Sequence, residues 1–232
     1  MREIQDQGLM KQYFRAHQIE AVFNEPLMQH LALYSFDRGE HICTQGESAQ
    51  MLYVLVKGKV KIYTTSVEGK SLILSFKTPL EVIGDIEYVR GSDIINTVEA
   101  VSPLHMIGIQ YHWLEKFGKE YAPFLQFLLE IITQKFYIKS DFLSFNLLYP
   151  VEVRLASYLL SVSFDESDSL FQGQLYTVSL MDTANLIGTS YRHLNRVIQK
   201  FCQDGLVERS KGGIIVKDRE GLQQLASRNI YE

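Results

Sequence analysis

The pattern of apolar and polar residues separates the chain into a first part typical of strands and a second part typical of helices. From about residue 31 to 110, short apolar runs such as MLYVLVKGKVKIYTT (51–65) are bounded by turn residues, and glycine recurs at regular intervals. This spacing favours a compact antiparallel barrel or jelly roll. Residues 1 to about 30, with apolar anchors before Pro26, predict a short helical lead-in.

Three groups of turn residues mark where the strands should be connected. They are Lys57-Gly58-Lys59, Glu68-Gly69 and Ser102-Pro103, each between two runs rich in β-branched or aromatic residues. Glycine and proline favour turns because they adopt or fix backbone angles that other residues populate poorly. Strands are therefore expected on both sides of each group.

A helical period follows the strands and is clearest in YAPFLQFLLEIITQKFYIKSDFLSFNLL (121–148). Pro123 falls in the first turn, where proline is tolerated, and the helix would be about 40 Å long. Tyr149-Pro150 ends it, because proline lacks a donor and restricts the residue before it. The expected divisions are a strand-rich domain at 1–120, the helix at 121–148 and a C-terminal domain at 149–232.

The long predicted helix carries apolar residues on more than one face. One stripe includes Leu125 and another includes Phe127. One of them can cover the barrel, and the simplest cover for the other is a second copy of the same helix. The alternative is a helix buried inside a single larger domain. The residues predicted to serve a dimer are Leu125, Leu128, Ile132, Ile138 and Phe142.

Residues 180–201, LMDTANLIGTSYRHLNRVIQKF, predict two short helices joined by a turn at Gly188. Capping residues are available before both helices: Ser179 or Asp182 for the first, and Thr189 or Ser190 for the second. Four apolar residues of the second helix recur at the spacing of one buried face: Leu194, Val197, Ile198 and Phe201. This arrangement predicts a helix–turn–helix.

Four polar residues share another face of the second helix: Arg192, Asn195, Arg196 and Gln199. In the major groove of DNA, Arg pairs bidentately with guanine, and Asn or Gln pairs with adenine. The alternative is an ordinary solvent-exposed face of an amphipathic helix. The segment GLVERSKGGIIVKD (205–218) predicts a hairpin, or wing, that offers Lys211 to phosphate. Double-stranded DNA is therefore the expected partner of this domain.

The charge of the chain supports a local basic patch rather than a basic protein. The net charge is −4, which disfavours indiscriminate coating of nucleic acid. Between Thr189 and Lys217, however, six basic residues accompany only two acidic ones. The candidate DNA-binding residues are Thr189, Ser190, Tyr191, Arg192, His193, Asn195, Arg196, Gln199, Lys200 and Lys211.

Composition disfavours several other classes of protein. Only Cys43 and Cys202 are present, so one chain cannot supply a four-cysteine iron–sulfur cluster. A buried thiol is expected at Cys43, with a redox role as the alternative. The histidines lack ligand spacing, and no nucleophile–base pair, metal motif or phosphate loop stands out, so no metal, cofactor or enzymatic activity is predicted. The absence of a long apolar run or of a signal peptide predicts a cytoplasmic protein.

Residues 30–225 resemble the Crp/Fnr family of bacterial transcription regulators. The resemblance rests on RGEHICTQGES (38–48), LYVLVKGKVKIY (52–63), EGKSLILSF (68–76), VIGDIE (82–87), RLASYLLS (154–161) and the helix–turn–helix, in this order. The motifs IGDIEYV, SYRHL and DGLV are most similar to the YeiL-like branch. The resemblance implies an α+β fold with a cyclic-nucleotide-binding-type β-roll, a long dimerisation helix and a winged helix–turn–helix. It also implies a homodimer that binds an operator and contacts RNA polymerase.

The chain departs from the family at the residues that bind cyclic nucleotide. The cyclic-AMP sites of the family use a helix beginning Gly-Glu-Leu and a downstream Arg-Ser pair that holds the phosphate. Here the helix begins Gly84-Asp85-Ile86-Glu87, and Ile94-Ile95-Asn96 replaces the pair, so cyclic nucleotide is not expected. An unidentified small molecule or the protein's own side chains would fill the region. Its candidate residues are Gly84, Asp85, Glu87, Arg90 and Asn96, of which Arg90 is the one nearby base.

The recognition helix departs from the family as well. Ser190 and Arg196 match the ends of an S-R-E-T-x-x-R arrangement, whereas Tyr191, Arg192 and His193 occupy its middle. The missing acidic residue removes an acceptor for cytosine, so the common half-sites of the family are not expected. Tyr191 is expected to contact phosphate or a thymine methyl group. His193 is expected either to contact phosphate or to lie on the free helix surface.

These expectations combine in a regulatory hypothesis. A signal at the β-roll or along the long helix would change how the domains sit about Tyr149-Pro150 and shift DNA-binding geometry between two states. A second hypothesis is a small-molecule sensor that acts mainly through a protein partner, with the C-terminal domain as a docking unit.

Overall fold

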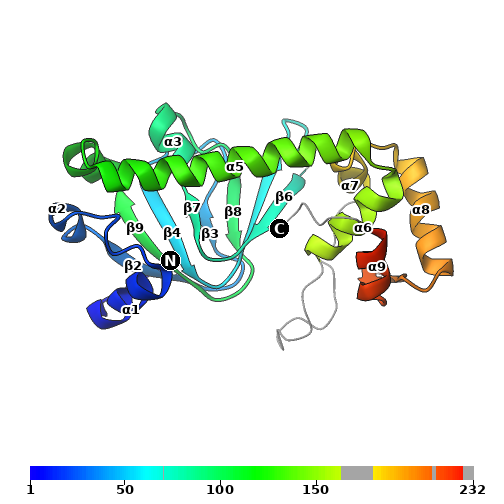
Figure 1. The fold of residues 1–232 in the computed structure, drawn as a ribbon, viewed down its shortest axis with the longest axis horizontal. Helices are drawn as coiled ribbons and strands as arrows, with labels where there is room; N and C mark the ends of the chain where they lie inside the picture. Colours follow the sequence, from blue (N-terminus) through cyan, green and yellow to red (C-terminus); the bar gives the residue numbers. More distant parts are fainter. Residues whose placement is uncertain (70, 163–179, 211–212, 227–232) are drawn as a thin grey trace. The chain divides into compact units, whose positions relative to one another are not determined.

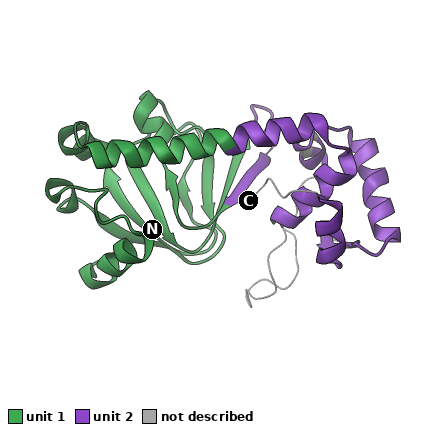
Figure 2. Cartoon of the chain, viewed as in Figure 1, with its two compact units in different colours: residues 1–65, 77–137 green, residues 66–76, 138–232 purple. Residues whose placement is uncertain are grey.

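The chain folds into two compact units (Figure 2). The structure, a computed structural model, describes residues 1–69, 71–162, 180–210 and 213–226. The first unit contains residues 1–65 and 77–137, and the second contains residues 66–76 and 138–232. One long helix, α5 (Ala122–Leu148), contributes residues to both units.

Antiparallel strands form two sheets in the first half of the chain (Figure 1). The strands are β1 (Arg2–Ile4), β2 (Ala32–Phe36), β3 (His41–Cys43), β4 (Met51–Lys57), β5 (Val60–Thr65), β6 (Ser71–Lys77), β7 (Glu81–Ile83), β8 (Thr97–Ala100) and β9 (Leu104–Gln110). Their orders are β1-β2-β9-β4-β7 and β3-β8-β5-β6. The turns predicted after β4, β5 and β8 are confirmed.

Strand β4 shows how the roll buries two cores at once. Successive residues of a strand point to opposite faces of the sheet. Leu52 and Val54 pack in a cluster with the N-terminal helices and the start of α5, whereas Tyr53 and Leu55 pack in a cluster between the two sheets. Because both faces are buried, this strand reads as a nearly continuous apolar run instead of an alternating one.

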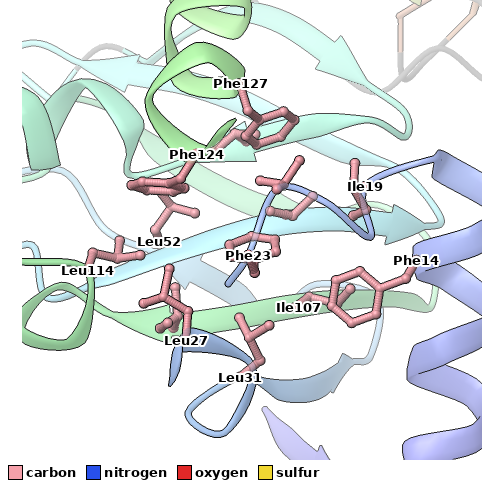
Figure 3. Packing of buried hydrophobic residues seen from close by; sticks show 14 of the residues in the cluster. Phe14, Ile19, Phe23, Leu27, Leu31, Leu52, Ile107, Leu114, Phe124 and Phe127 are labelled. Atoms are coloured by element: carbon pink, nitrogen blue, oxygen red, sulfur yellow. The ribbon is translucent and has the colours of Figure 1, made fainter. Parts of the chain in front are cut away.

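Short helices close the first cluster. They are α1 (Gln7–His17), α2 (Glu25–Met28), α3 (Asp85–Arg90), α4 (Tyr111–Trp113) and a π-helical segment, η1 (Leu114–Gly118). Phe14 of α1 and Leu27 of α2 are almost fully buried there, as Figure 3 shows. The sequence predicted a helical lead-in, and the structure adds strand β1 before it, paired with β2 from Arg2 opposite Ser35. Residues that precede a helix can thus extend a sheet when an edge strand offers free backbone groups.

Helix α5 is one continuous helix, as predicted, and its first turns pack on the roll. Phe124, Phe127 and Leu128 are buried in the first cluster, where Phe124 lies beside Leu52 (Figure 3) and its ring centroid is 6.1 Å from that of Phe23. Leu128, assigned from sequence to a dimer stripe, is only 3 % exposed and belongs to this core instead. The stripe expected to meet a second copy must therefore lie on another side of the helix.

The second unit carries the predicted helix–turn–helix and wing. Its elements beyond α5 are α6 (Val151–Val162), α7 (Leu180–Leu186), α8 (Tyr191–Gln203), β10 (Val207–Ser210), β11 (Gly213–Val216) and α9 (Arg219–Leu225). Asp218 caps α9 by accepting from the N–H of Gly221 at 2.8 Å. The predicted α+β fold of roll, long helix and winged helix–turn–helix is confirmed. No helix in the described part of the chain combines the length and apolar character needed to cross a membrane.

Candidate nucleic-acid interface

The turn between α7 and α8 has a backbone geometry that glycine adopts readily and other residues do not. Gly188 has a φ of 64°, in the left-handed region. The N–H of Thr189 donates to the carbonyl of Ala184 at 2.8 Å. This bond across a left-handed residue is the pattern of a Schellman helix ending. The predicted turn at Gly188 is therefore confirmed, and the chain enters α8 at a fixed angle.

Arg154 of α6 supports this turn from the interior. Its guanidinium donates to the carbonyl of Ile187 and, at 3.5 Å, to that of Gly188. Arg154 is 9 % exposed, and the carbonyls it meets follow α7, where a helix leaves acceptors unpaired and carries partial negative charge. No role for Arg154 was predicted from sequence, because the contact joins residues 33 positions apart.

Ser190 is the N-cap of α8. Its backbone is extended, and its hydroxyl accepts from the N–H of His193 at 3.2 Å. Of the two caps predicted for this helix, Ser190 is confirmed. A hydroxyl that accepts one bond can still donate its proton, so the same side chain can meet phosphate. Of the caps predicted for α7, Ser179 and the side chain of Asp182 lie outside the described part of the chain.

Helix α8 divides into a buried face and an exposed face. The predicted core residues Leu194, Val197, Ile198 and Phe201 are at most 3 % exposed. The exposed candidates are Tyr191, Arg192, Arg196, Gln199 and Lys200, whereas Thr189 and His193 are half-buried. Within the described residues, Arg192, Arg196 and Gln199 make no hydrogen bond or ion pair. Their donors are therefore available to a duplex.

Asn195 differs from these neighbours. Its side-chain amide donates to the carbonyl of Tyr191 at 3.0 Å, and its Oδ1 accepts from the Arg209 guanidinium at 2.6 Å. Arg209 belongs to β10, so this contact joins the helix to the wing. The sequence placed Asn195 among the free base-reading residues and did not single out Arg209.

The wing is the antiparallel pair of β10 and β11, with Ser210 opposite Gly213. This pairing confirms the predicted hairpin. Lys211, predicted to meet phosphate, lies outside the described residues. Glu208 and Lys217 form an exposed ion pair at 3.2 Å, which contributes little to stability because solvent screens it.

In the roll, the candidate effector residues Gly84, Asp85 and Glu87 lie at the start of α3. Gly84 precedes this helix with a φ of 88°, and a Cβ there would lie 2.4 Å from the carbonyl oxygen of Met51. Its own carbonyl accepts from the Tyr111 hydroxyl at 2.6 Å. Burial, and then the nearby Glu87 and Asp85 carboxylates, raise the pKa of Tyr111. Gly84 is thus a packing requirement, and Tyr111 remains a neutral donor.

Asp85 is paired with a lysine of α5. Lys135 Nζ lies 2.8 Å from Glu81 Oε1, 2.9 Å from both Asp85 oxygens and 2.6 Å from the carbonyl of Val82. Burial alone would lower the pKa of Lys135, but the two carboxylates outweigh it and raise the pKa. The lysine therefore stays charged and joins α5 to both ends of the segment from β7 to α3.

Glu87 is buried and bonds to the segment that replaces the phosphate-binding pair. Its Oε1 accepts from the backbone N–H of Ile95 at 3.0 Å. The Cys43 sulfur lies 3.8 Å from the carbonyl of Asn96, and burial together with Glu87 raises the pKa of Cys43 to about 12. Arg90 is exposed at the far end of α3. The structure thus brings Glu87, Asn96 and Cys43 together and leaves Arg90 apart.

Two family models match this chain. The cyclic nucleotide-binding domain matches residues 33–121, and the Crp-like helix-turn-helix domain matches residues 153–225. The chain belongs to the Crp/Fnr family of transcription regulators. DNA-binding regulation of transcription is therefore the function of its family, and the α7–α8 unit is the part that family members use to bind DNA.

Similarity to known regulators covers most of the chain. The regulatory protein YeiL of Escherichia coli O157:H7 is 27 % identical over 194 residues, which are 84 % of this chain and 85 % of that protein. The cyclic AMP receptor protein of Thermus thermophilus is 26 % identical over 204 residues, which are 84 % and 91 % of the two chains. The c-di-GMP-responsive regulator CLP of Xanthomonas campestris shares the fold, with a TM-score of 0.61 at 21 % identity over 83 % of this chain and 96 % of that one.

A Gly188→Ala substitution tests the turn of this family member. We expect it to lower the free energy of unfolding by about 1–2 kcal/mol, because alanine is strained at this φ and its Cβ would lie 3.2 Å from the Arg154 guanidinium. Urea unfolding followed by circular dichroism measures the change. Gly205→Ala is the matched control, since Gly205 has a φ of 74° but open space around a Cβ. A Gly188 variant no less stable than the Gly205 variant would contradict the role given to Arg154.

Proposed function

We propose that the protein is a homodimeric, sequence-specific transcription regulator that reads a roughly two-fold symmetric operator with α8. Family membership supports DNA-binding regulation. The dimer and the reading of an operator by α8 are argued from residues of this chain. The observation that carries the proposal is the free polar face of α8, opposite a stripe of apolar side chains that is at most 3 % exposed. The buried stripe fixes the rotation of the helix, so the polar face must point outward.

The exposed residues of α8 suit two kinds of contact with DNA. Arg192 and Arg196 offer the forked donors that pair with guanine, and Gln199 offers the amide that pairs with adenine. Tyr191 and Lys200, at the two ends of this face, suit the phosphates on either side of the groove. Ser190, Thr189 and His193 at the N-terminal end of α8 add hydrogen-bonding groups close to the backbone of the duplex.

An exposed apolar seam on α5 supports a dimer. The seam consists of five exposed residues and the half-buried Ile132: Leu125, Leu129, Ile132, Phe136, Leu143 and Leu147, spaced four, three, four, seven and four residues apart. Leu129 is 60 % exposed, Phe136 71 % and Leu147 77 %. A repeat of this spacing is typical of a helix that packs against another helix as a coiled coil. Among the residues proposed from sequence, Leu125 and Ile132 lie on the seam, while Ile138 and Phe142 are half-buried beside the core face.

Within the described residues, the apolar side chains of the seam remain largely exposed to solvent. Exposed polar residues, among them Gln126, Glu130 and Gln134, lie beside the seam on α5, together with the exposed Tyr137 and Leu148. A second copy of α5 would cover the seam with an identical one, as two-fold symmetry requires. In the dimers formed by helix–turn–helix proteins, two recognition helices lie about 34 Å apart and read half-sites one helical turn apart. The operator is accordingly expected to be a palindrome.

The charges in the roll support control without cyclic nucleotide. Glu81, Asp85 and Glu87 are each less than 10 % exposed, and among the described residues Lys135 is the cation that pairs with Glu81 and Asp85. A cyclic phosphate would enter a region whose carboxylates already outnumber its cation, and no arginine stands at residues 94–96 to hold it. We therefore propose that the regulator responds to another signal or is competent to bind DNA without a ligand.

Selection from genomic fragments with the full-length protein is expected to enrich one palindromic sequence. Arg196→Ala should then weaken operator binding by about 1–3 kcal/mol and relax the preference at one base pair of each half-site. Lys200→Ala is the matched control, because loss of a phosphate contact weakens all sequences alike. Fluorescence anisotropy at fixed salt measures both. Unchanged operator binding by the Arg196 variant would instead favour a sensor that acts through a protein partner.

Phe136→Glu is expected to convert the dimer to a monomer, because it places two facing carboxylates in the apolar seam. Sedimentation equilibrium at micromolar concentration measures the mass. Gln134→Glu adds the same charge to the polar side of α5 and should leave the dimer intact. A Phe136 variant that remains dimeric, or a wild-type chain that is monomeric, would rule out this seam as the interface.

Cyclic AMP and cyclic GMP at 1 mM are expected to leave the thermal unfolding midpoint unchanged. A site with a Kd of about 10 μM would add about 2.7 kcal/mol under these conditions, which the midpoint would report clearly. Lys135→Met tests the sensitivity of the assay, because loss of the lysine leaves two carboxylates without a cation and should cost about 3 kcal/mol. A midpoint that rises with nucleotide concentration would contradict the proposed ligand independence.

A further inference from the structure

The amide of Asn195 is occupied at both ends. Its nitrogen donates to the carbonyl of Tyr191 at 3.0 Å, one turn earlier in α8, and its oxygen accepts from Arg209 at 2.6 Å. An asparagine that reads adenine needs both groups, since it accepts from N6 and donates to N7 of the base. Asn195 is also half-buried, unlike Arg192 and Arg196. In this conformation it therefore cannot read a base.

The position of Arg209 follows from the alternation of β10. Val207 is 3 % exposed and faces the core beneath α8. Arg209 is two residues further along, so its side chain leaves the strand on the same side. Glu208, between them, points the other way and pairs with Lys217. The strand thus sends one arginine toward the recognition helix, just beyond the edge of the buried core.

Among the described residues, the contact with Asn195 leaves most of the Arg209 guanidinium donors unused. A guanidinium carries five N–H donors, and this hydrogen bond uses one of them. Asn195 is neutral, so it orients the guanidinium without cancelling its charge, in contrast to the carboxylate that pairs with Lys217. Arg209 is exposed and lies on the wing, next to the free arginines of α8. An oriented cation at this place suits a phosphate of the strand that borders the groove.

We propose that Arg209 binds a DNA phosphate and that Asn195 is the positioning residue that holds it. This inference rests on the proposed function, because it assumes that α8 enters the major groove. It moves Asn195 from the base-reading set to a supporting role and adds Arg209 to the DNA-binding residues. It also couples helix and wing, since a shift of one against the other would break the contact that aims the guanidinium.

A double-mutant cycle on the selected operator tests the coupling. Dissociation constants are measured at salt concentrations from about 50 to 300 mM, where contacts with phosphate make the affinity depend on salt. The proteins compared are the wild type, Asn195→Ala, Arg209→Ala, the double variant and Arg209→Lys. Arg209→Ala should weaken binding about five- to ten-fold and reduce the salt slope by about one. Asn195→Ala should weaken binding less, and the double variant should match Arg209→Ala. Arg209→Lys, which keeps the charge, should restore the salt slope.

The base preference of the Asn195→Ala variant distinguishes a positioning residue from a base-reading residue. Selection repeated with Asn195→Ala should recover the wild-type motif at every position. Lys217→Ala is the control for a wing cation paired with a carboxylate, and it should change the affinity less than two-fold. Thermal unfolding of each variant checks that the second unit remains folded. If Arg209→Ala lowers the unfolding midpoint, Arg209→Lys provides the test instead.

Three results would overturn the inference while leaving the proposed function intact. They are a motif from Asn195→Ala that has lost one adenine, additive effects of the two substitutions, and an Arg209→Ala salt slope equal to that of the wild type. If the wild-type protein enriched no sequence at all, the proposed function would fail and this inference with it.

Discussion

Burial of one stripe of α8 is the constraint on which the DNA-binding surface depends. Burying a Leu, Ile, Val or Phe side chain stabilises a protein by about 1.5–3 kcal/mol, and four such residues lie on this stripe. Contacts between neighbours on a helix surface contribute only about 0.2–0.5 kcal/mol each. The stripe therefore decides the rotation of α8. Arg192 and Arg196 face outward because the opposite side of the helix is buried. The left-handed turn at Gly188 and the Arg154 guanidinium behind it then decide where the helix starts.

In the β-roll, ion pairs of buried carboxylates constrain how α5 packs. Glu81 and Asp85 are buried, and an unpaired carboxylate in such a place would cost several kcal/mol. Lys135 supplies the compensating charge from α5, so the long helix is held to the roll by an ion pair as well as by Phe124 and Phe127. In this chain, side chains of the protein itself join the roll to α5.

Features with a local cause were predictable from the sequence. The period of the strands, the Ser190 cap, the turn at Gly188 and the buried stripe of α8 each follow from residues a few positions apart. Features that join distant segments were not. The Arg154 contact, the Lys135 ion pair with Asp85 and the Arg209 contact with Asn195 span 33, 50 and 14 residues, and no periodic pattern in the sequence predicts them. Asn195 has the residue type and the spacing of a base reader, and only its partner on the wing distinguishes it.

Chemical modification of the arginines with phenylglyoxal, read residue by residue by mass spectrometry with and without operator DNA, tests the central claim most directly. The free protein should react at Arg192 and Arg196, which are exposed on α8, and at the exposed reference residues Arg15 and Arg90. In the operator complex, the two α8 arginines should become protected while the reference residues keep their reactivity. Equal reactivity of Arg192 and Arg196 in the free and bound states would show that the outward face of α8 does not meet DNA.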